Sequence, residues 1–292
     1  MSVEIKIPTI YGLTLTTKDS YIEDDIVITV GIPRFKGENS DGATFEIDEF
    51  LGGNLTEYVN HTAKKLKYGF CNNYSITSVI FTEVEEVGDR TFSGCAKLEN
   101  FYMPKVRKVG PYGFHGTRIN PDNSVFSTIE EWEGSNQFYA VTAKGAVNMP
   151  KITSLPTACF ASAGITSFRA DNCTTQGGNQ AFSNCASLEY VFFDKLTEVG
   201  TQWFNSCKAL KKAEFNSVRN FRGYAFQGCS TLEVLIIRTP DVVATTDSNM
   251  FYSFTFTGTV YVPDNLVEQY KVATNWSVYA DNIKPLSEYV EG

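Results

Sequence analysis

The chain has 292 residues and a net charge of −8, and its 42% hydrophobic and 20% charged residues are typical of a folded protein rather than a disordered one. The negative charge argues against nucleic-acid binding, which needs clustered Lys and Arg, and against adsorption to anionic lipid. The longest apolar run, Val234–Ile237, is far shorter than the roughly 20 residues of a membrane span, so we expect no membrane insertion. The first residues, MSVEIKIPTIYGL, lack the basic and apolar regions of a secretory signal.

Residues 1–36 are predicted to form a small N-terminal β-hairpin module. Residues 13–17 (LTLTT) and 26–30 (IVITV) alternate between apolar and polar side chains, as half-buried strands do. The polar residues 18–25 would connect these two strands. This segment differs from everything that follows it.

Residues 37–262 are dominated by one repeat of about 22 residues. Phenylalanines recur from Phe70 to Phe251 at intervals of 22, 22, 24, 22, 22, 22, 22 and 25 residues. The clearest copies read Phe-x-x-Cys-x-x-Leu, then a short alternating run, then a Val-Gly pair; they begin at Phe92, Phe182, Phe204 and Phe226. A register kept over this length predicts about eight consecutive structural repeats.

Each part of the repeat has a predicted structure. The alternating run indicates a half-buried strand, in which Leu98, Phe101 and Met103 would point inward while Asn100 and Tyr102 point outward. The segment from Val-Gly to Cys is expected to be a short helical or 3-10 turn that directs its Phe into the core. One such unit cannot bury its own apolar face, so stacking of neighbouring units must supply the core. The fold class we predict is therefore a repeat solenoid, mainly β with short helical or 3-10 turns.

Two copies depart from the pattern. The copy that begins at Phe114 carries two extra residues before Phe138, where we expect a bulge or local irregularity. The copy that begins at Phe160 has a turn that is one residue shorter.

Four of the seven cysteines occupy one repeat position. Other copies have Thr117, Val141 or Ala163 there, which predicts a small buried residue; disulfides or redox sensing between adjacent coils are the alternative. The sequence has no Cys-x-x-Cys motif and no Cys/His cluster, so we predict neither a metal nor a cofactor.

Residues 263–292 are predicted to form a C-terminal helical cap after a last strand at 258–263. Asp264 would be the N-cap, since Leu266, Val267 and Tyr270 follow it at helical spacing. The cap would cover the last Phe layer, because a solenoid has to close its open end.

The Phe-x-x-Cys-x-x-Leu pattern at this period resembles the BspA-type leucine-rich repeats of bacterial surface proteins and phage-encoded proteins, over about residues 60–262. The closing segment, V-P-D…Y-K…W…I-K-P, is similar to that of the same proteins. The N-terminal segment T-L-x-T…D-I-V-I-T resembles structural proteins of phages and prophages of gut Firmicutes. The resemblance implies a leucine-rich-repeat solenoid with a binding function.

Residues with catalytic potential lack the partners that catalysis needs. His61 and His115 lie in no nucleophile or zinc-protease motif, and no glycine-rich phosphate loop is present. The acidic clusters at 83–86 and 130–133 are expected to be solvated turn residues rather than the paired carboxylates of a glycosidase. Asp24–Asp25 and Asp122–Asn123 match no known calcium motif. We therefore predict that the chain is not an enzyme.

The outward strand positions are the predicted binding face. A solvated sheet face is normally polar, but here it carries several large apolar side chains, which favours contact with another protein, another subunit or a sugar. The alternative is that other parts of the chain, or strand propensity alone, account for these residues. The candidate residues are Ile80, Tyr102, Arg169, Tyr190, Phe192, Lys212, Glu214 and Ile236.

Three functions are compatible with these features. The first is a non-catalytic phage virion protein of the tail or capsid that recognises a host-surface protein or glycan and assembles with other virion proteins or as a homo-oligomer. The second is a BspA-like adhesin on a bacterial cell surface. The third, a glycan-active enzyme on a repeat scaffold, lacks a credible pair of acids.

Overall fold

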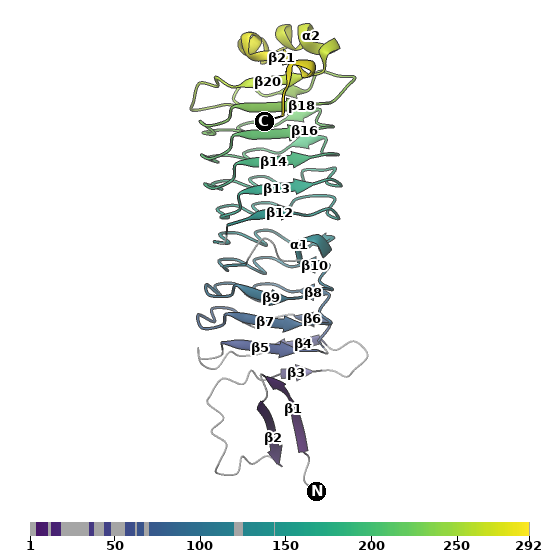
Figure 1. Ribbon diagram of the computed structural model, residues 1–292, viewed down its shortest axis with the longest axis vertical. Helices are drawn as coiled ribbons and strands as arrows, with labels where there is room; N and C mark the ends of the chain where they lie inside the picture. Colours follow the sequence, from purple (N-terminus) through teal and green to yellow (C-terminus); the bar gives the residue numbers. More distant parts are fainter. Residues whose placement is uncertain are drawn as a thin grey trace.

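The computed structural model describes residues 4–10, 13–18, 35–37, 44–47, 56–61, 63–66, 70–119, 125–142 and 144–291. From about residue 56 onward the chain winds into a column of stacked coils, and the C-terminal helix α2 (Val267–Val272) lies at one end of the column (Figure 1). The solenoid predicted from the repeat is thus confirmed. It is mainly β, with a small helical cap.

The first row of strands follows the Leu of each repeat. Every pair within it is parallel, because each coil passes in the same direction. One sheet contains β5 (Glu57–Asn60), β7 (Ser78–Phe81) and β9 (Asn100–Tyr102). The second sheet contains β12 (Ala146–Asn148), β13 (Ser167–Ala170), β14 (Tyr190–Phe193), β16 (Lys212–Phe215), β18 (Val234–Ile237), β20 (Thr259–Val262) and β21 (Ile283–Pro285).

A second row of shorter strands lies at the Val-Gly step. Its first sheet contains β3 (Phe35–Gly37), β4 (Thr44–Ile47), β6 (Lys65–Leu66), β8 (Glu86–Val87), β10 (Lys108–Val109) and β11 (Glu131–Trp132). Its second sheet contains β15 (Glu198–Val199), β17 (Asn220–Phe221) and β19 (Thr245–Thr246). All these pairs are parallel except β3–β4.

The remaining side of each coil is formed by the Phe turn. The backbone N–H groups of Arg90, Phe92 and Gly94 donate to carbonyl oxygens of the next coil at 2.8–2.9 Å, and the same pattern recurs at the later turns. Residues two before and two after the Phe adopt positive φ, for example Arg90 (49°) and Gly94 (77°). Hydrogen bonds between residues three apart close these segments into consecutive tight turns, at the place where we expected short helical or 3-10 turns.

The core is a ladder of stacked aromatic rings. Neighbouring phenylalanines from Phe70 to Phe251 have ring centroids 5.1–5.9 Å apart, one ring for each coil. These distances fall in the range of favourable aromatic pairs. The one-Phe-per-coil interpretation of the sequence is therefore confirmed.

The repeated cysteines are buried and carry no disulfide. The Sγ of each donates to the carbonyl oxygen of the Phe in the preceding coil at 2.8–3.1 Å, and burial raises the pKa of the Cys95 thiol to about 12. The thiol therefore stays protonated and acts as a small buried donor, as the structural interpretation of this position predicted.

The copy that begins at Phe114 differs from its neighbours: among the described residues, no strand of the first row lies between β9 and β12. Between β9 and β12 the described chain forms helix α1 (Val125–Thr128), which buries Val125 and Phe126. The Phe126 ring lies 5.0 Å from Phe138, so the helix still contributes to the core. The described part of this copy is therefore irregular, as the two extra residues predicted, because it carries a helix that the other copies lack.

The C-terminal cap consists of η1 (Asp264–Leu266), α2, η2 (Ser277–Asn282), β21 and η3 (Leu286–Glu288). Tyr279 packs edge-on against Phe251 at 5.2 Å, and Trp276 is fully buried, so the cap covers the last Phe layer as expected. The predicted N-cap role of Asp264 is wrong. Its carboxylate instead accepts a hydrogen bond from the backbone N–H of Ser287 at 3.1 Å, which lowers its pKa.

The described part of the N-terminal module is a hairpin that contains the predicted strand at 13–17. β1 (Glu4–Ile10) pairs antiparallel with β2 (Leu13–Lys18), whereas the sequence favoured a pairing of 13–17 with 26–30. Residues 26–30 lie outside the described residues. β3 spans the predicted boundary at residue 36 and pairs with β4, which joins the second strand row through β6.

Candidate functional site

The outer surface of the first strand row brings most of the predicted binding residues side by side. Strand register aligns Arg169 with Phe192, Phe192 with Glu214, and Glu214 with Ile236, so that these four side chains form one line across four strands. The parallel line two residues earlier contains Tyr190 and Lys212. Ile80 on β7 and Tyr102 on β9 are register partners of each other, in the part of the row before helix α1. The eight residues therefore form two groups, of six and of two.

These residues differ widely in exposure. Tyr102 is 52% exposed and Arg169 is also exposed, while Ile80, Tyr190 and Lys212 are half-buried. Phe192, Glu214 and Ile236 are buried. The expected row of exposed apolar residues is therefore not present at Phe192 and Ile236, because other parts of the chain cover them.

Phe192 is covered by a neighbour on the same face. The Arg169 guanidinium lies 4.2 Å from the centroid of the Phe192 ring, and its Nε also pairs with Asp171 at 2.9 Å. A cation over a ring face is favourable by about 0.5–1 kcal/mol at exposed sites. The pair presents a flat guanidinium at the surface, supported from below by an apolar ring.

Glu214 is the centre of a polar cluster. Its carboxylate pairs with Lys212 at 3.2 Å and with Arg238 at 2.9 Å, and it accepts a hydrogen bond from the Tyr190 hydroxyl at 3.5 Å. Partial burial disfavours the charge of Lys212, but hydrogen bonds to Tyr289 and Glu214 outweigh this and raise its pKa. Lys212 therefore keeps its positive charge at neutral pH.

Ile236 is covered by the C-terminal segment. The Tyr289 ring lies 5.0 Å from the Tyr261 ring on β20, and the Lys212 Nζ on β16 lies 5.1 Å from the Tyr289 centroid. Because β18 lies between β16 and β20, Tyr289 crosses over the strand that carries Ile236. Figure 1 shows the chain running back from the cap across these strands toward the C-terminus.

Three residues of this surface were not among those predicted. Tyr261 follows the same outward alternation as the others, so the sequence pattern could have identified it. Arg238 follows directly after β18, and Tyr289 lies beyond the last repeat. Arg238 continues the outward alternation of Val234 and Ile236, so the pattern could have identified it, whereas no periodic signal marks Tyr289.

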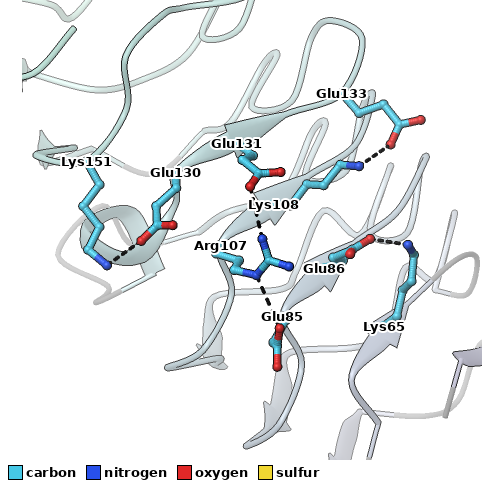
Figure 2. A network of polar contacts seen from close by, with 9 residues as sticks. All are labelled: Lys65, Glu85, Glu86, Arg107, Lys108, Glu130, Glu131, Glu133 and Lys151. Carbon is cyan, nitrogen blue, oxygen red and sulfur yellow. Dashed lines mark hydrogen bonds and ion pairs between the residues drawn. The ribbon is translucent and has the colours of Figure 1, made fainter. Parts of the chain in front are cut away.

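The acidic clusters of the sequence lie on the second strand row and alternate with basic clusters, coil by coil. Figure 2 shows Arg107 between Glu85 and Glu131, with contacts of 3.3 and 3.1 Å. The other ion pairs in this ladder are Lys65–Glu86, Lys105–Glu83, Lys108–Glu133 and Lys151–Glu130. Each pair joins adjacent coils, so the ladder favours one stacking register.

This ladder does not resemble a glycosidase centre. The hydrogen bond from Lys65 lowers the pKa of Glu86, and the hydrogen bond from Lys151 lowers the pKa of Glu130. A catalytic general acid needs the opposite shift, so that it carries a proton near neutral pH. These carboxylates are ion-pair partners on an open surface, consistent with the solvated turns that we expected.

The two histidines also have structural partners. His115 Nδ1 lies 3.0 Å from Ser93 Oγ, and its ring lies between those of Tyr112 and Tyr139 at 5.7 and 5.4 Å. Burial and the nearby Arg90 lower the pKa of His115, so the ring is neutral at pH 7. His61 contacts Thr82 Oγ1 at 3.2 Å. Neither histidine is close to a nucleophile–acid pair among the described residues.

Neither a metal-binding cluster nor a helix that could span a membrane is present among the described residues. The described residues contain no group of three or more His, Cys, Asp or Glu side chains placed to bind a metal ion. Across the same residues, no helix combines the length and apolar character that crossing a membrane requires.

A comparison with protein families gives one match. The model of the BspA type leucine rich repeat region, present in six copies, matches residues 64–189 and 153–274. The matched region thus covers the solenoid and the start of the cap. No curated protein matches the chain.

Several solved structures of bacterial proteins are similar in their repeats. The T. pallidum leucine rich repeat protein is 18% identical to this chain, and the match covers 73% of this chain and 83% of the T. pallidum protein, with a TM-score of 0.33. A leucine rich cell surface protein from Faecalibacterium prausnitzii is 16% identical, with 80% and 96% covered and a TM-score of 0.34. The pneumococcal vaccine antigen PcpA is 10% identical, with 90% and 99% covered and a TM-score of 0.36.

Proposed function

Because the chain belongs to the BspA-type leucine-rich repeat family, we propose that it is a non-catalytic binding protein of the cell-surface adhesin type. The partner, a protein or a glycan of another cell, would lie against the outer face of the first strand row. The observation that carries this proposal is the surface from β7 to β14. There, Tyr102 is 52% exposed, and Arg169 presents its guanidinium from the Phe192 ring next to Tyr190.

The chemistry of this surface suits recognition rather than reaction. Tyr and Arg are enriched in binding hot spots because each combines a large contact area with directional hydrogen bonds. The same side chains stack on sugar rings and on apolar protein side chains. A stacked column holds them on rigid strands, so little entropy is lost when a partner binds.

Binding should depend on these side chains and not on exposed aromatic residues elsewhere. The test is binding of the purified protein to a glycan array and to a panel of extracellular matrix proteins. We expect the triple variant Tyr102→Ala, Arg169→Ala, Tyr190→Ala to bind any partner found at least about tenfold more weakly, which is a loss of about 1.4 kcal/mol. The matched control is Tyr74→Ala with Tyr252→Ala, which removes two rings that are 63% and 56% exposed on the Phe-turn side. Unchanged binding in the triple variant would contradict the proposal.

A virion-borne version of the same function is supported by the likeness of residues 1–36 to phage structural proteins. In that case the N-terminal module would attach the column to other virion proteins, and the same face would contact the host cell. Genes for tail, portal or baseplate proteins next to the gene for this chain would support the virion location. A neighbourhood of wall-anchoring or secretion genes would instead support the bacterial surface.

A further inference from the structure

The outer face of the first strand row is covered over only part of its length. The third residues of β12, β13, β16 and β18 lie in one line across the sheet. In this line Asn148 and Arg169 are exposed, Glu214 is 7% exposed and Ile236 is 0% exposed. Strand register places all four at equivalent positions, so the repeat itself gives no reason for this difference. Burial increases where the C-terminal segment crosses the sheet.

The segment from Leu286 to Glu291, which we call the strap, is attached firmly at its start. β21 pairs with β20, and Asp264 accepts the N–H of Ser287 at 3.1 Å. The next backbone hydrogen bond, from the N–H of Tyr289 to the carbonyl oxygen of Leu286 at 3.0 Å, is internal to the strap. The strap beyond Ser287 therefore lies on the sheet through side-chain contacts.

Tyr289 is the anchor among those contacts. Its ring packs against Tyr261 and lies over the Lys212 ammonium group, as described above. Glu291 adds a longer ion pair to Lys212 at 3.8 Å, with its own side chain 84% exposed. Elements held by few side-chain contacts open at a small fraction of the free energy of global unfolding.

The surface beneath the strap has a definite chemical character. Ile236 and the half-buried Val234 form an apolar floor, and the Tyr190 and Tyr261 rings lie at its sides. Lys212 and Arg238 share the single carboxylate of Glu214, which leaves one net positive charge in a protein whose net charge is −8. This floor complements an extended segment that carries an aromatic ring followed closely by a carboxylate.

We propose that the outer face of β16, β18 and β20 is a binding site for acidic, aromatic peptide segments, and that the strap occupies it as an internal ligand. The proposal deepens the proposed function, on which it rests in taking this face as a recognition surface. A partner with a Tyr-x-acid segment would displace the strap and extend its contact from Arg169 toward Tyr261. The strap would then set the minimum affinity that a partner needs, because the partner must compete with a tethered segment of similar chemistry.

The test uses a fluorescently labelled peptide with the sequence of residues 286–292 (LSEYVEG) and the full chain, followed by fluorescence anisotropy at low salt. We expect Tyr289→Ala, which releases the strap, to bind this peptide at least about tenfold more tightly than the unchanged chain. A peptide in which the tyrosine is replaced by alanine should lose that binding. Adding Lys212→Glu to Tyr289→Ala should also abolish it, because the cation that contacts both ring and carboxylate becomes an anion.

Equal peptide binding by the unchanged chain and by Tyr289→Ala would overturn the proposal, as would no binding by either. Hydrogen exchange provides a second measurement: in Tyr289→Ala, the segment 286–291 should exchange faster while β16 to β20 stay protected. Dimerisation of the unchanged chain by exchange of its strap would assign the site to a second copy and also overturn the proposal. Neither measurement involves Tyr102 or Arg169, so failure here is distinguishable from failure of the proposed function.

Discussion

The first strand row before the irregular coil and the same row after it are built from one repeat, yet they present different surfaces. Before that coil, Ile80 and Tyr102 lie side by side, half-buried and exposed respectively. After it, Ile236 occupies an outward strand position and is completely buried. The repeat decides which side chains point away from the core, whereas neighbours on that face, such as Arg169 over Phe192, and the C-terminal segment over Ile236 decide which of them meet solvent.

The two regions also differ in the number of ion pairs that join neighbouring coils. In the first region, acidic and basic coils alternate along the second strand row, with Arg107 bridging two acidic coils. In the second, the first strand row runs without a break from β12 to β21. Backbone pairing also joins the coils of the first region, whose second strand row is a six-stranded sheet, and ion pairs such as Lys211–Glu189 and Arg222–Glu198 join adjacent coils of the second region. The ladder around Arg107 is the denser of the two sets of ion pairs. Three changes would test this comparison.

Removal of a core ring should have the largest effect. We expect Phe92→Ala in the first region and Phe182→Ala in the second each to cost about 3–5 kcal/mol, because both rings are completely buried in the ladder. The measurement is urea unfolding followed by circular dichroism. Equal losses would show that the regions share one core and differ only at the surface. The control Tyr252→Ala should change the free energy of unfolding by less than about 0.5 kcal/mol. A loss below about 1 kcal/mol for either Phe variant would contradict the conclusion that the stacked rings form the core.

Outward-facing isoleucines should separate the two regions directly. Ile236→Ala should cost about 2 kcal/mol, since it leaves a cavity beneath the strap, whereas Ile80→Ala should cost less than about 1 kcal/mol. Both changes remove the same atoms from outward strand positions, so each is the control for the other. Similar values in the same unfolding experiment would mean that the strap does not shield Ile236 in solution.

The ion-pair ladder should have the smallest effect, visible mainly as a dependence on pH. Glu86 and Glu130 have lowered pKa values in the folded state, so their pairing stabilises the protein above the ordinary glutamate pKa of 4.5 and is lost as pH falls below it. The midpoint temperature of unfolding should therefore fall between pH 5 and roughly pH 3. The double variant Lys65→Met, Lys151→Met should show a shallower fall at low salt, because its carboxylates regain an ordinary pKa. An identical slope in both proteins would assign the acid sensitivity to other groups.

Some features of the site could be predicted from the sequence, and others could not. Alternation in each strand correctly placed Tyr102, Arg169 and Tyr190 on the outer face, because side-chain direction in a strand has a fixed period of two. The same rule placed Ile236 there but could not show that Tyr289, more than fifty residues further along the chain, would cover it. Asp264 matched a helix N-cap pattern, yet its carboxylate bonds to Ser287, which the cap brings back beside it.

The sequence by itself determined the repeat, the inward Phe and Cys positions and the presence of a cap, because each of these follows from a periodic pattern or a local signal. The tertiary structure alone decided the place of helix α1 in the irregular coil, the alternating ion pairs between coils and the cover over β16 to β20. All three depend on contacts between residues far apart in the chain, at positions where many side chains are locally acceptable. The local sequence pattern therefore determines the stacked column. The packing of its irregular coil and of its C-terminal segment determines which part of the outer strand face stays exposed.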